Sequence, residues 1–459
     1  MTQTVRFISS IHDIGSETWN TLLDTDNPFL RFEFLSALED TYCIDSPKNT
    51  PFMKDSQNYK SIDSGWIPHY AILEELPPEN QSSNQEPNIL AIAPVFKKYH
   101  SYGEYVFDWS WAEAYERHGL NYYPKLVWAI PFTPSSGPRI ISQGTLEQIN
   151  DYYQKIAQGL TEYCQLNQLS GWHCLFPDAP ANVSLNTPPP LGSSKTTTMQ
   201  RLSCQFHWYN NKHSLVNINN DSSNYFQDFE EYLETFSSRK RKNVKKERTK
   251  LLTEGFTFQQ KESDEITPED ILSFYNCYQQ TYAKRNSQGY LSLEFFQRIH
   301  QEMPEALLLV QAKLPVRTTP SDNDKIHAQD PYQKNDTLEV VANALYFKDE
   351  NNLYGRYWGC FEEFYNLHFE CCYYQGIEYC IKKRLGHFDP GTQGEHKISR
   401  GFRPITCFSQ HWIAHPQFAE AIQDFIHSEK QNIQLYAEAA GQRLPFNQSY
   451  LNTSKNDNK

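Results

Sequence analysis

The stretch VVANALYFKDENNLYGRYWGC, from Val340 to Cys360, holds two apolar runs of strand length on either side of the polar segment KDENN. β-Branched and aromatic side chains dominate both runs and suit a pleated, half-buried surface. The polar segment between them has the Asp and Asn residues that favour tight turns. Two such runs joined by a short loop are typical of a β-hairpin. The sequence therefore predicts an antiparallel hairpin here.

Elements on both sides of the hairpin extend it into an α/β unit. The segment LHFECCYYQGIEYCIKKRLG, residues 367–386, predicts a helix that ends with Gly386 as its C-cap. Six side chains share one face of that helix: Leu367, Cys371, Tyr374, Ile377, Ile381 and Leu385. Strands are expected at 307–314 and 405–413, and a long helix follows from residue 416.

The first half of the chain shows a similar order. Strand-like runs at 69–75 and 89–99 precede an amphipathic helix at 145–165, for which Thr145 is the expected N-cap. Further strands end near residue 210. The repeated order predicts two related α/β units. Three polar, turn-rich stretches interrupt the pattern and are expected to be surface loops: 43–64, 177–198 and 317–337.

Composition limits the classes of protein that fit. The 459 residues are 39% hydrophobic, which suffices for sizeable cores, and the net charge of −13 argues against diffuse binding of nucleic acid. The ten cysteines include no Cys-x-x-Cys pair, and no apolar run approaches the length of a membrane span. The start of the chain lacks the features of a secretory signal. We therefore expect a cytoplasmic, reduced protein without a membrane span or a metal site.

The segment SSRKRKNVKKERTKLL, residues 237–252, concentrates positive charge. Eight basic residues and one acidic residue fall within twelve of its positions. On a helix, Arg239, Lys242 and Lys246 would share one face. Such a face can bind a polyphosphate or an RNA backbone. The alternative is a solvated helix surface without a partner.

The segment DPGTQGEHKISRGF, residues 389–402, combines glycines with groups that bind or move protons. Gly391 and Gly394 would let backbone N–H groups turn toward an anion. Glu395 and His396 could supply a general base. The alternative is a tight structural connection between a helix and a strand. The many polar and charged side chains among its glycines favour a functional role for this segment.

The stretch at 98–139 places carboxylates among many aromatic residues and shows little helical or strand periodicity. Glu104, Asp108 and Trp109 lie in it. Aromatic loops with interspersed carboxylates line small-molecule clefts. The alternative is a loop that buries its rings against the core.

Motifs of several large enzyme classes are missing from the sequence. It contains no G-x-x-x-x-G-K-[ST], no G-x-G-x-x-G and no G-x-S-x-G. These absences disfavour P-loop ATPases, kinases, Rossmann dehydrogenases and α/β-hydrolases.

Six segments together resemble a bacterial family of predicted N-acyltransferases: NPFLRFEFLSALED (27–40), SYGEYVFDWSWAEAYERHGLNYYPKL (101–126), SSRKRKNVKKER (237–248), LYGRYWGC (353–360), LHFECCYYQGIEY (367–379) and PGTQGEHKISRGF (390–402). That family is described as peptidoglycan biosynthesis or recognition proteins and is grouped with the GNAT superfamily. The second half is also similar to FemAB-type aminoacyltransferases, in which a Leu-x-x-Glu step into a helix precedes a glycine and an Asp-Phe-Gly-like turn. Leu367 and Glu370 match the first element, and Gly386, Asp389 and Gly391 match the second.

The resemblance implies an α/β chain of two tandem GNAT-like domains, with mixed sheets flanked by helices. The expected domains are 1–212 and 213–446, the second opened by the basic helix, with a disordered tail at 447–459. The implied donor is acyl-CoA or aminoacyl-tRNA, with no metal cofactor. One departure matters: CFEEFYNLHFECC, residues 360–372, stands where ordinary GNAT enzymes have a glycine loop for the CoA pyrophosphate. It has no glycine and three glutamates, which counts against acetyl-CoA.

We therefore expect transfer of an acyl or aminoacyl group to an amine, with a peptidoglycan precursor or a related metabolite as acceptor and tRNA as one potential partner. His396 is favoured as the base, since an unperturbed histidine pKa suits neutral pH, and Glu395 would position a group or water. Backbone N–H groups between Gly391 and Gly394 would stabilise the oxyanion. Residues 389–402 would form one wall of the acyl-transfer site and face the loop with Asp108 and Trp109, with Asp389 bracing the turn through its own backbone. In an extended segment Glu395 and His396 would point to opposite faces. The residues expected to hold substrate, beyond these glycines, are Glu104, Asp108, Trp109, Arg356, Glu370, Lys397 and Arg400. The alternative is a non-catalytic protein that recognises a cell-wall precursor or another anionic ligand.

Overall fold

The computed structural model describes residues 2–45, 64–77, 86–186, 197–213, 222–284, 286–316, 338–392 and 394–456. By internal contacts the chain forms two compact units. Unit 1 comprises Met1–Gln205, Tyr290–Ile299 and Pro404–Gln442, and unit 2 comprises Phe206–Gly289, His300–Arg403 and Arg443–Lys459. Each unit thus combines segments that are far apart in the sequence. The domain boundary expected at residue 212 stays a prediction, and most of the three polar stretches lie outside the described residues.

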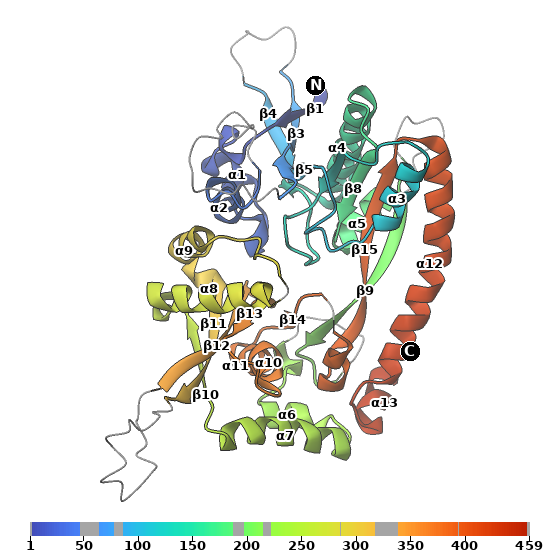
Figure 1. Ribbon diagram of the computed structural model, residues 1–459. Coiled ribbons are helices and arrows are strands. Elements are labelled where there is room, and N and C mark those ends of the chain that lie inside the picture. The colour runs from blue at the N-terminus through green and yellow to red at the C-terminus, as the bar shows by residue number, and fades with distance from the viewer. Residues whose placement is uncertain are drawn as a thin grey trace, which may run out of the picture. The chain divides into compact units, whose positions relative to one another are not determined.

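Unit 1 holds two groups of paired strands (Figure 1). An antiparallel sheet has the order β1-β3-β4-β7, built from Gln3–Ile8, Tyr70–Glu75, Asn88–Ala93 and Ile141–Ser142. The strands of the second group, in the order β15-β8-β6-β5-β2, are Arg403–Ile413, Gly171–Leu175, Lys125–Trp128, Val95–Lys98 and Trp66–Pro68. Of these, β6 and β8 run parallel while the other pairs are antiparallel, so the sheet is mixed.

The core of unit 1 forms against helix α4 (Leu146–Leu166). Thr145 caps this helix as expected, because its side chain accepts from Gln148 N while the Gln148 side chain accepts from Thr145 N. Ile156 and Leu160 on its inner face join a fully buried cluster that includes Trp128 and Trp172. The other helices of unit 1 include α1 (Ser16–Leu22), α2 (Phe32–Asp40), α3 (Trp109–Arg117), α5 (Ala179–Asn186) and α12 (Pro416–Gln442).

Unit 2 contains the expected hairpin. Its strands β12 (Leu338–Lys348) and β13 (Asn352–Cys360) pair antiparallel across the KDENN turn. The strand order is β10-β11-β12-β13-β14-β9, and the further strands are Thr257–Glu262, Leu307–Pro315, His387–Asp389 and Met199–Tyr209. Strand β9 begins in unit 1, and only its residues from Phe206 onward belong to unit 2. Because β14 pairs parallel to β13 and antiparallel to β9, this sheet is also mixed. The fold class expected from the sequence, α/β with mixed sheets flanked by helices, is confirmed.

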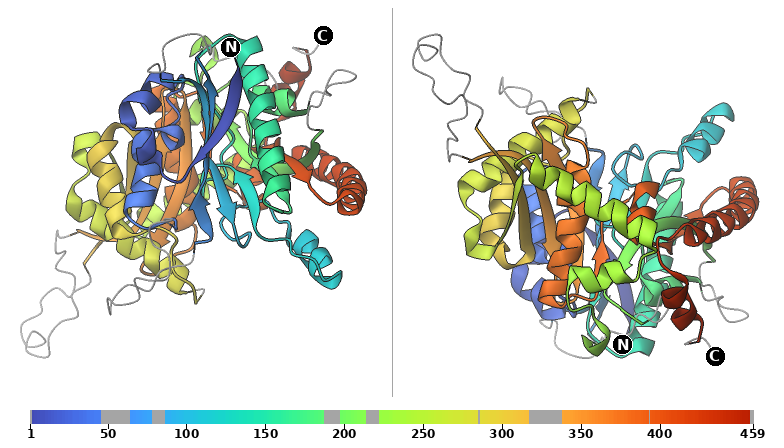
Figure 2. Two further views of the ribbon diagram at one scale, coloured as in Figure 1. Left: turned by 90° about the horizontal axis from the view of Figure 1, so that it is seen from above. Right: turned by 90° about the horizontal axis from the view of Figure 1, so that it is seen from below.

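Unit 2 also contains the helices α6 (Phe229–Glu234), α7 (Ser238–Thr253), α8 (Pro268–Ala283), α10 (Leu367–Phe369), α11 (Gln375–Lys383) and α13 (Gln448–Asn456), while α9 (Leu293–Glu302) crosses from unit 1 into unit 2. Of these, α8 packs against β12 and β13, and α11 packs against β13 and β14. Figure 2 shows α7 beside α11, and an ion pair between Arg248 and Glu378 joins the two helices. No helix among the described residues is long and apolar enough to cross a membrane.

Five local expectations are wrong. Helix α5 lies within the stretch 177–198 that was expected to be a surface loop, and its Leu185 is buried. The strand expected at 89–99 is divided at Pro94, and the stretch at 98–139 contains helix α3 and strand β6. Gly386 is not the C-cap of α11: Arg384 takes the left-handed conformation there, and Gly386 N donates to Asn351 O at 2.9 Å. In the part of the tail that the structure describes, α13 replaces the expected disorder, and its Tyr450 is buried.

Candidate functional site

The segment Asp389–Phe402 forms a compact turn at the end of β14. The carboxylate of Asp389 accepts a hydrogen bond from Gly391 N at 2.9 Å, which confirms that this aspartate braces the turn through the backbone. Gly391 and Gly394 have φ values of 82° and 99°, a region that residues with a Cβ atom rarely adopt. The extended conformation considered for Glu395 and His396 is wrong, because Glu395–Arg400 is a 3₁₀ helix.

His396 is exposed on one side and lies against aromatic rings on the other. Its Nε2 is 2.8 Å from the hydroxyl of Tyr373, and its ring centroid is 5.3 Å from that of Phe369. Tyr373 belongs to the π-helical turn Glu370–Tyr374, an irregularity often found at functional sites. Burial, together with the charges of Arg400 and Lys397, lowers the pKa of His396 to about 4. The imidazole is therefore neutral at pH 7 and a weaker base than an unperturbed histidine.

Lys397 is almost completely buried, with 1% of its surface exposed. Its ammonium donates to the carbonyl oxygens of Gly391 at 2.5 Å and Thr392 at 3.3 Å, and so holds the glycine turn. Burial lowers the pKa of Lys397 to about 8, although the nearby Asp389 carboxylate acts in the opposite direction. A lysine with such a pKa can exchange a proton near neutral pH. From the sequence, Lys397 was expected only to bind substrate, because the burial that lowers its pKa is not visible in the sequence.

Two neighbouring charged residues, Arg400 and Glu395, each form an ion pair with a residue outside the segment Asp389–Phe402. Arg400 lies over the ring of Phe369 at 3.5 Å and donates to the carboxylate of Glu247 at 2.8 Å. Glu395 points away toward Arg443, with an exposed ion pair of 3.1 Å. This segment therefore brings His396, Lys397 and Arg400 together, while Glu395 lies at its solvent side.

Glu370 forms a buried ion pair. Arg248 of α7 donates to it at 2.7 Å and 3.0 Å and also reaches Glu378 of α11, and Gln375 donates to Glu370 at 2.9 Å. This pairing attaches α7 to the π-helical turn. A substrate contact of Glu370, expected from the sequence, stays a prediction. Arg356 lies on β13 with its guanidinium 5.6 Å from the ring of Tyr357, and its expected role also stays a prediction.

Helix α7 confirms the helix expected for the basic segment. Arg239, Lys242 and Lys246 are all exposed on one side, while Val244 and Arg248 face the protein. Ser237 is the N-cap residue by position. This exposed basic face suits contact with a polyanion or with solvent, so binding of a polyanion to α7 stays a prediction.

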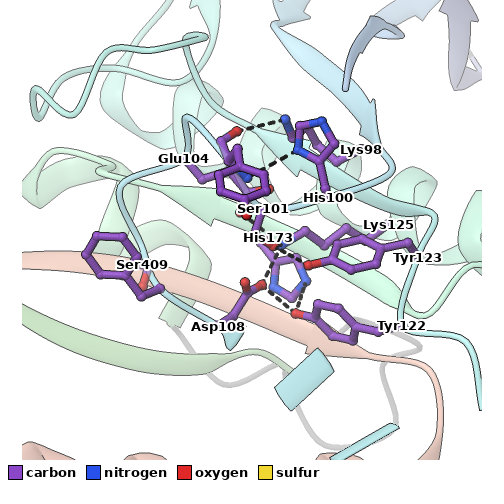
Figure 3. Close-up of polar contacts among 12 residues, drawn as sticks. Lys98, His100, Ser101, Glu104, Asp108, Tyr122, Tyr123, Lys125, His173 and Ser409 are labelled. Atoms are coloured by element: carbon purple, nitrogen blue, oxygen red, sulfur yellow. Dashed lines mark hydrogen bonds and ion pairs between the residues drawn. The ribbon is translucent and has the colours of Figure 1, made fainter. Parts of the chain in front are cut away.

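A second cluster of buried charges lies within unit 1 (Figure 3). Lys125 of β6 is fully buried and donates to Ser101 Oγ at 2.8 Å and to Glu104 Oε2 at 2.9 Å. It also forms an ion pair with Asp108, whose Oδ2 accepts from the Tyr122 hydroxyl at 2.6 Å. The sequence suggested the two carboxylates but not the lysine that holds them together.

Hydrogen bonds extend this cluster across unit 1. The Tyr122 hydroxyl is 3.2 Å from His173 Nε2, and His173 Nδ1 is 2.7 Å from His411 Nδ1. His411 Nε2 is 2.8 Å from Ser409 Oγ. Trp109 stands at the surface, 39% exposed, with its ring centroid 4.9 Å from that of Tyr102.

Burial and charge set the pKa values of the two carboxyls in opposite directions. Burial raises the pKa of Glu104 to about 7, although Lys125 opposes this rise. Burial also disfavours the charged form of Asp108, but the Lys125 ammonium overcomes it and holds the pKa of Asp108 well below its usual range. The pair thus combines one ionised carboxylate with one carboxyl that titrates near neutral pH.

This arrangement predicts a pH effect on stability that depends on Glu104. A carboxyl whose folded pKa exceeds its unfolded value contributes stability below the ordinary pKa and loses it as pH rises through the folded pKa. Between pH 5 and pH 8, wild type should lose up to about 3 kcal/mol of unfolding free energy relative to Glu104→Gln. Denaturant unfolding of both proteins at each pH measures this difference. Parallel pH profiles for the two proteins would contradict it.

No group of three or more His, Cys, Asp or Glu side chains that could hold a metal ion occurs in the described part of the chain. The sequence prediction that residues 389–402 face the loop of Asp108 concerns two different units and stays a prediction.

The fold is of the α/β class with mixed sheets that the sequence segments suggested. A family model for FemAB-like proteins of peptidoglycan biosynthesis/recognition matches residues 10–321 and 326–448. The chain belongs to this FemAB-like family. No curated protein sequence matches it significantly.

Solved structures provide likenesses of fold alone. The crystal structure of FemX is 11% identical, with 91% of this chain and 100% of that chain covered and a TM-score of 0.44. The structure of L-PGS from Bacillus licheniformis is 9% identical, with 73% and 86% covered and a TM-score of 0.39. A tandem GNAT protein from the clavulanic acid biosynthesis pathway is 6% identical, with 90% and 99% covered and a TM-score of 0.36.

Proposed function

We propose that the protein transfers an activated acyl or aminoacyl group to a primary amine, and that the segment Asp389–Phe402 carries the reaction. The observation that carries this proposal is the buried Lys397, held against the glycine turn with its pKa lowered to about 8. Membership in a family of peptidoglycan biosynthesis/recognition supports a peptidoglycan precursor with a free amine as acceptor.

The reaction needs few groups from the protein. The neutral amine attacks the acyl carbon, a C–N bond forms, and the C–O or C–S bond to the donor breaks, so the leaving group gains a proton while the amine loses one. We assign the proton exchange to Lys397, because burial lowers its pKa to about 8, and His396, the base expected from the sequence, is the competing candidate. Backbone N–H groups of the turn at Gly391 and Gly394 would stabilise the oxyanion of the tetrahedral intermediate.

A direct assay tests the proposal and its alternative. The purified chain is incubated with an amine-bearing peptidoglycan precursor and either a mixed aminoacyl-tRNA pool or an acyl-CoA series, and mass spectrometry detects the amide product. Product with one donor class supports the transferase and identifies its donor. Tight binding of the precursor without product from any donor would support the non-catalytic recognition protein instead.

The exposed face of α7 would hold a polyanionic donor such as tRNA. Arg239, Lys242 and Lys246 present their charges together on one side of the helix. Changing all three to Glu should weaken tRNA binding by about 10- to 100-fold at low salt, and the difference should shrink as salt screens the charges. Fluorescence anisotropy with labelled tRNA over a range of ionic strength measures it.

A matched control separates local charge from net charge. Changing Lys284, Lys382 and Lys430 to Glu alters the net charge equally at exposed positions outside α7. This control should keep most of the affinity. If both triple variants bind tRNA as wild type does, α7 is a solvated face.

A further inference from the structure

A chain of hydrogen bonds in unit 2 begins at Asn352, whose amide orientation is fixed by its neighbours. Asn352 Nδ2 lies 2.8 Å and 3.0 Å from the two carboxylate oxygens of Asp349, so this atom must be the NH₂ donor. The other side of the amide, Oδ1, lies 2.8 Å from His387 Nδ1. Because Oδ1 can only accept, His387 Nδ1 carries a hydrogen and donates it.

The tautomer of His387 then determines that of His207. Burial, with His207 contributing, lowers the pKa of His387 well below neutrality, so the ring is neutral and its Nε2 is a bare acceptor. This Nε2 lies 2.7 Å from His207 Nδ1. The contact is a hydrogen bond only if His207 Nδ1 donates. A neutral His207 would therefore have no hydrogen on its second nitrogen, Nε2.

That second nitrogen faces a carboxylate. His207 Nε2 is 3.4 Å from Oδ1 of Asp389, and both side chains are buried. Two acceptors at this distance would repel each other, whereas one added proton turns the contact into an attraction, whichever atom carries it. The proton makes either an imidazolium beside a carboxylate or a neutral imidazole beside a carboxylic acid, and both pairs carry no net charge.

We infer that His207 and Asp389 share one proton, so that this buried pair is electrically neutral and leaves the ammonium of Lys397 without a fully anionic neighbour. The consequence for catalysis rests on the proposed acyl transfer: His207 becomes a positioning residue that acts through Asp389 to keep Lys397 able to exchange its proton. Removing His207 would leave Asp389 as an unshared anion that holds the proton on Lys397.

The charged groups around His207 come from several elements. Asp389 and His387 face it from β14. Burial lowers the pKa of His207 from its ordinary value, Asp389 acts in the opposite direction, and Lys397 of the 3₁₀ helix lowers the pKa further. On β15, Arg403 lies over the ring of Tyr209, two residues beyond His207. Among these groups, Asp389 favours a proton on His207 while Lys397 disfavours it, which is why a shared proton responds to a change at either residue.

The experiment measures the protonation of Lys397 directly. The full chain is labelled with ¹³C at lysine Cε, the Lys397 signal is assigned by its loss in Lys397→Met, and its shift is followed with pH. His207→Leu should raise the titration midpoint of Lys397 by about one pH unit or more, whereas Asp389→Asn, which replaces one neutral neighbour by another, should leave the midpoint nearly unchanged. A purely structural role would move both variants in the same direction, because both lose the same contact.

Further variants keep the test independent of folding and of activity. His207→Gln can still donate to Asp389 but cannot lend it a proton, so it should raise the midpoint as His207→Leu does. His300→Gln, which changes a histidine bonded to Ile266 O elsewhere in unit 2, should leave it unchanged. A midpoint in His207→Gln equal to that of wild type, or a clearly lower midpoint in Asp389→Asn, would overturn the shared proton. Because the signal reports protonation and not transfer, a protein without transferase activity would still give a clear answer.

Discussion

Replacement of Lys125 by methionine is expected to lower the free energy of unfolding by about 3–5 kcal/mol, because it leaves buried carboxylates without their cation. Lys125 has no exposed surface and binds both Glu104 and Asp108. Methionine fills much of the same volume, so the loss comes mainly from the uncompensated charge and only slightly from a cavity. Denaturant unfolding of the purified variant and of wild type at pH 8 measures it.

Neutralising the carboxylates tests the cause of this loss. The triple variant Lys125→Met, Glu104→Gln, Asp108→Asn has no buried charge in the cluster and should recover a large part of the lost stability. The recovery should be smaller at pH 5, because Glu104, with its pKa near 7, is already protonated there. A Lys125→Met protein within 1 kcal/mol of wild type at pH 8 would show that water or movement compensates the charge.

Local patterns in the sequence predicted the elements of the fold that depend on neighbouring residues. The hairpin at 340–360 and the capped helix α4 follow from alternation, turn residues and the Thr145 cap. Helix α3 was missed because its aromatic residues alternate with charged ones in a short, nine-residue helix. The π-helical turn Glu370–Tyr374 was missed as well, since its residues are compatible with an ordinary helix.

The two clusters were only partly predictable for a different reason. Each brings together groups that are distant in the sequence: in unit 1 Lys125 is 17 positions from Asp108, and in unit 2 His207 is 180 positions from His387. Composition identified the segment with His396 and Lys397, but the roles of these two residues depend on burial. An unperturbed histidine would suit neutral pH, whereas the structure lowers the pKa of His396 to about 4 and brings that of Lys397 to about 8.

Replacement of Lys397 by methionine is expected to reduce amine acylation by about 10²–10⁴-fold, which is the range for loss of a general acid or base. Lys397→Arg should be impaired as well, because arginine keeps the charge but holds its proton at all relevant pH values. Donor binding to α7 should persist in both variants, since Lys397 is buried away from that exposed face. Product formation under single-turnover conditions, compared with tRNA affinity, separates chemistry from binding.

The pH dependence of the wild-type rate distinguishes Lys397 from His396 as the base. A base acts in its unprotonated form, so a rate controlled by Lys397 should rise as pH increases through about 8. A rate controlled by His396 should instead level off well below pH 7, because a pKa near 4 leaves the imidazole unprotonated there. Wild-type turnover in Lys397→Met, together with a large loss in His396→Ala and a rate that is flat above pH 6, would assign the base to His396. In that case the buried ammonium acts by holding the carbonyl groups of Gly391 and Thr392, and the glycine turn keeps its shape without proton exchange.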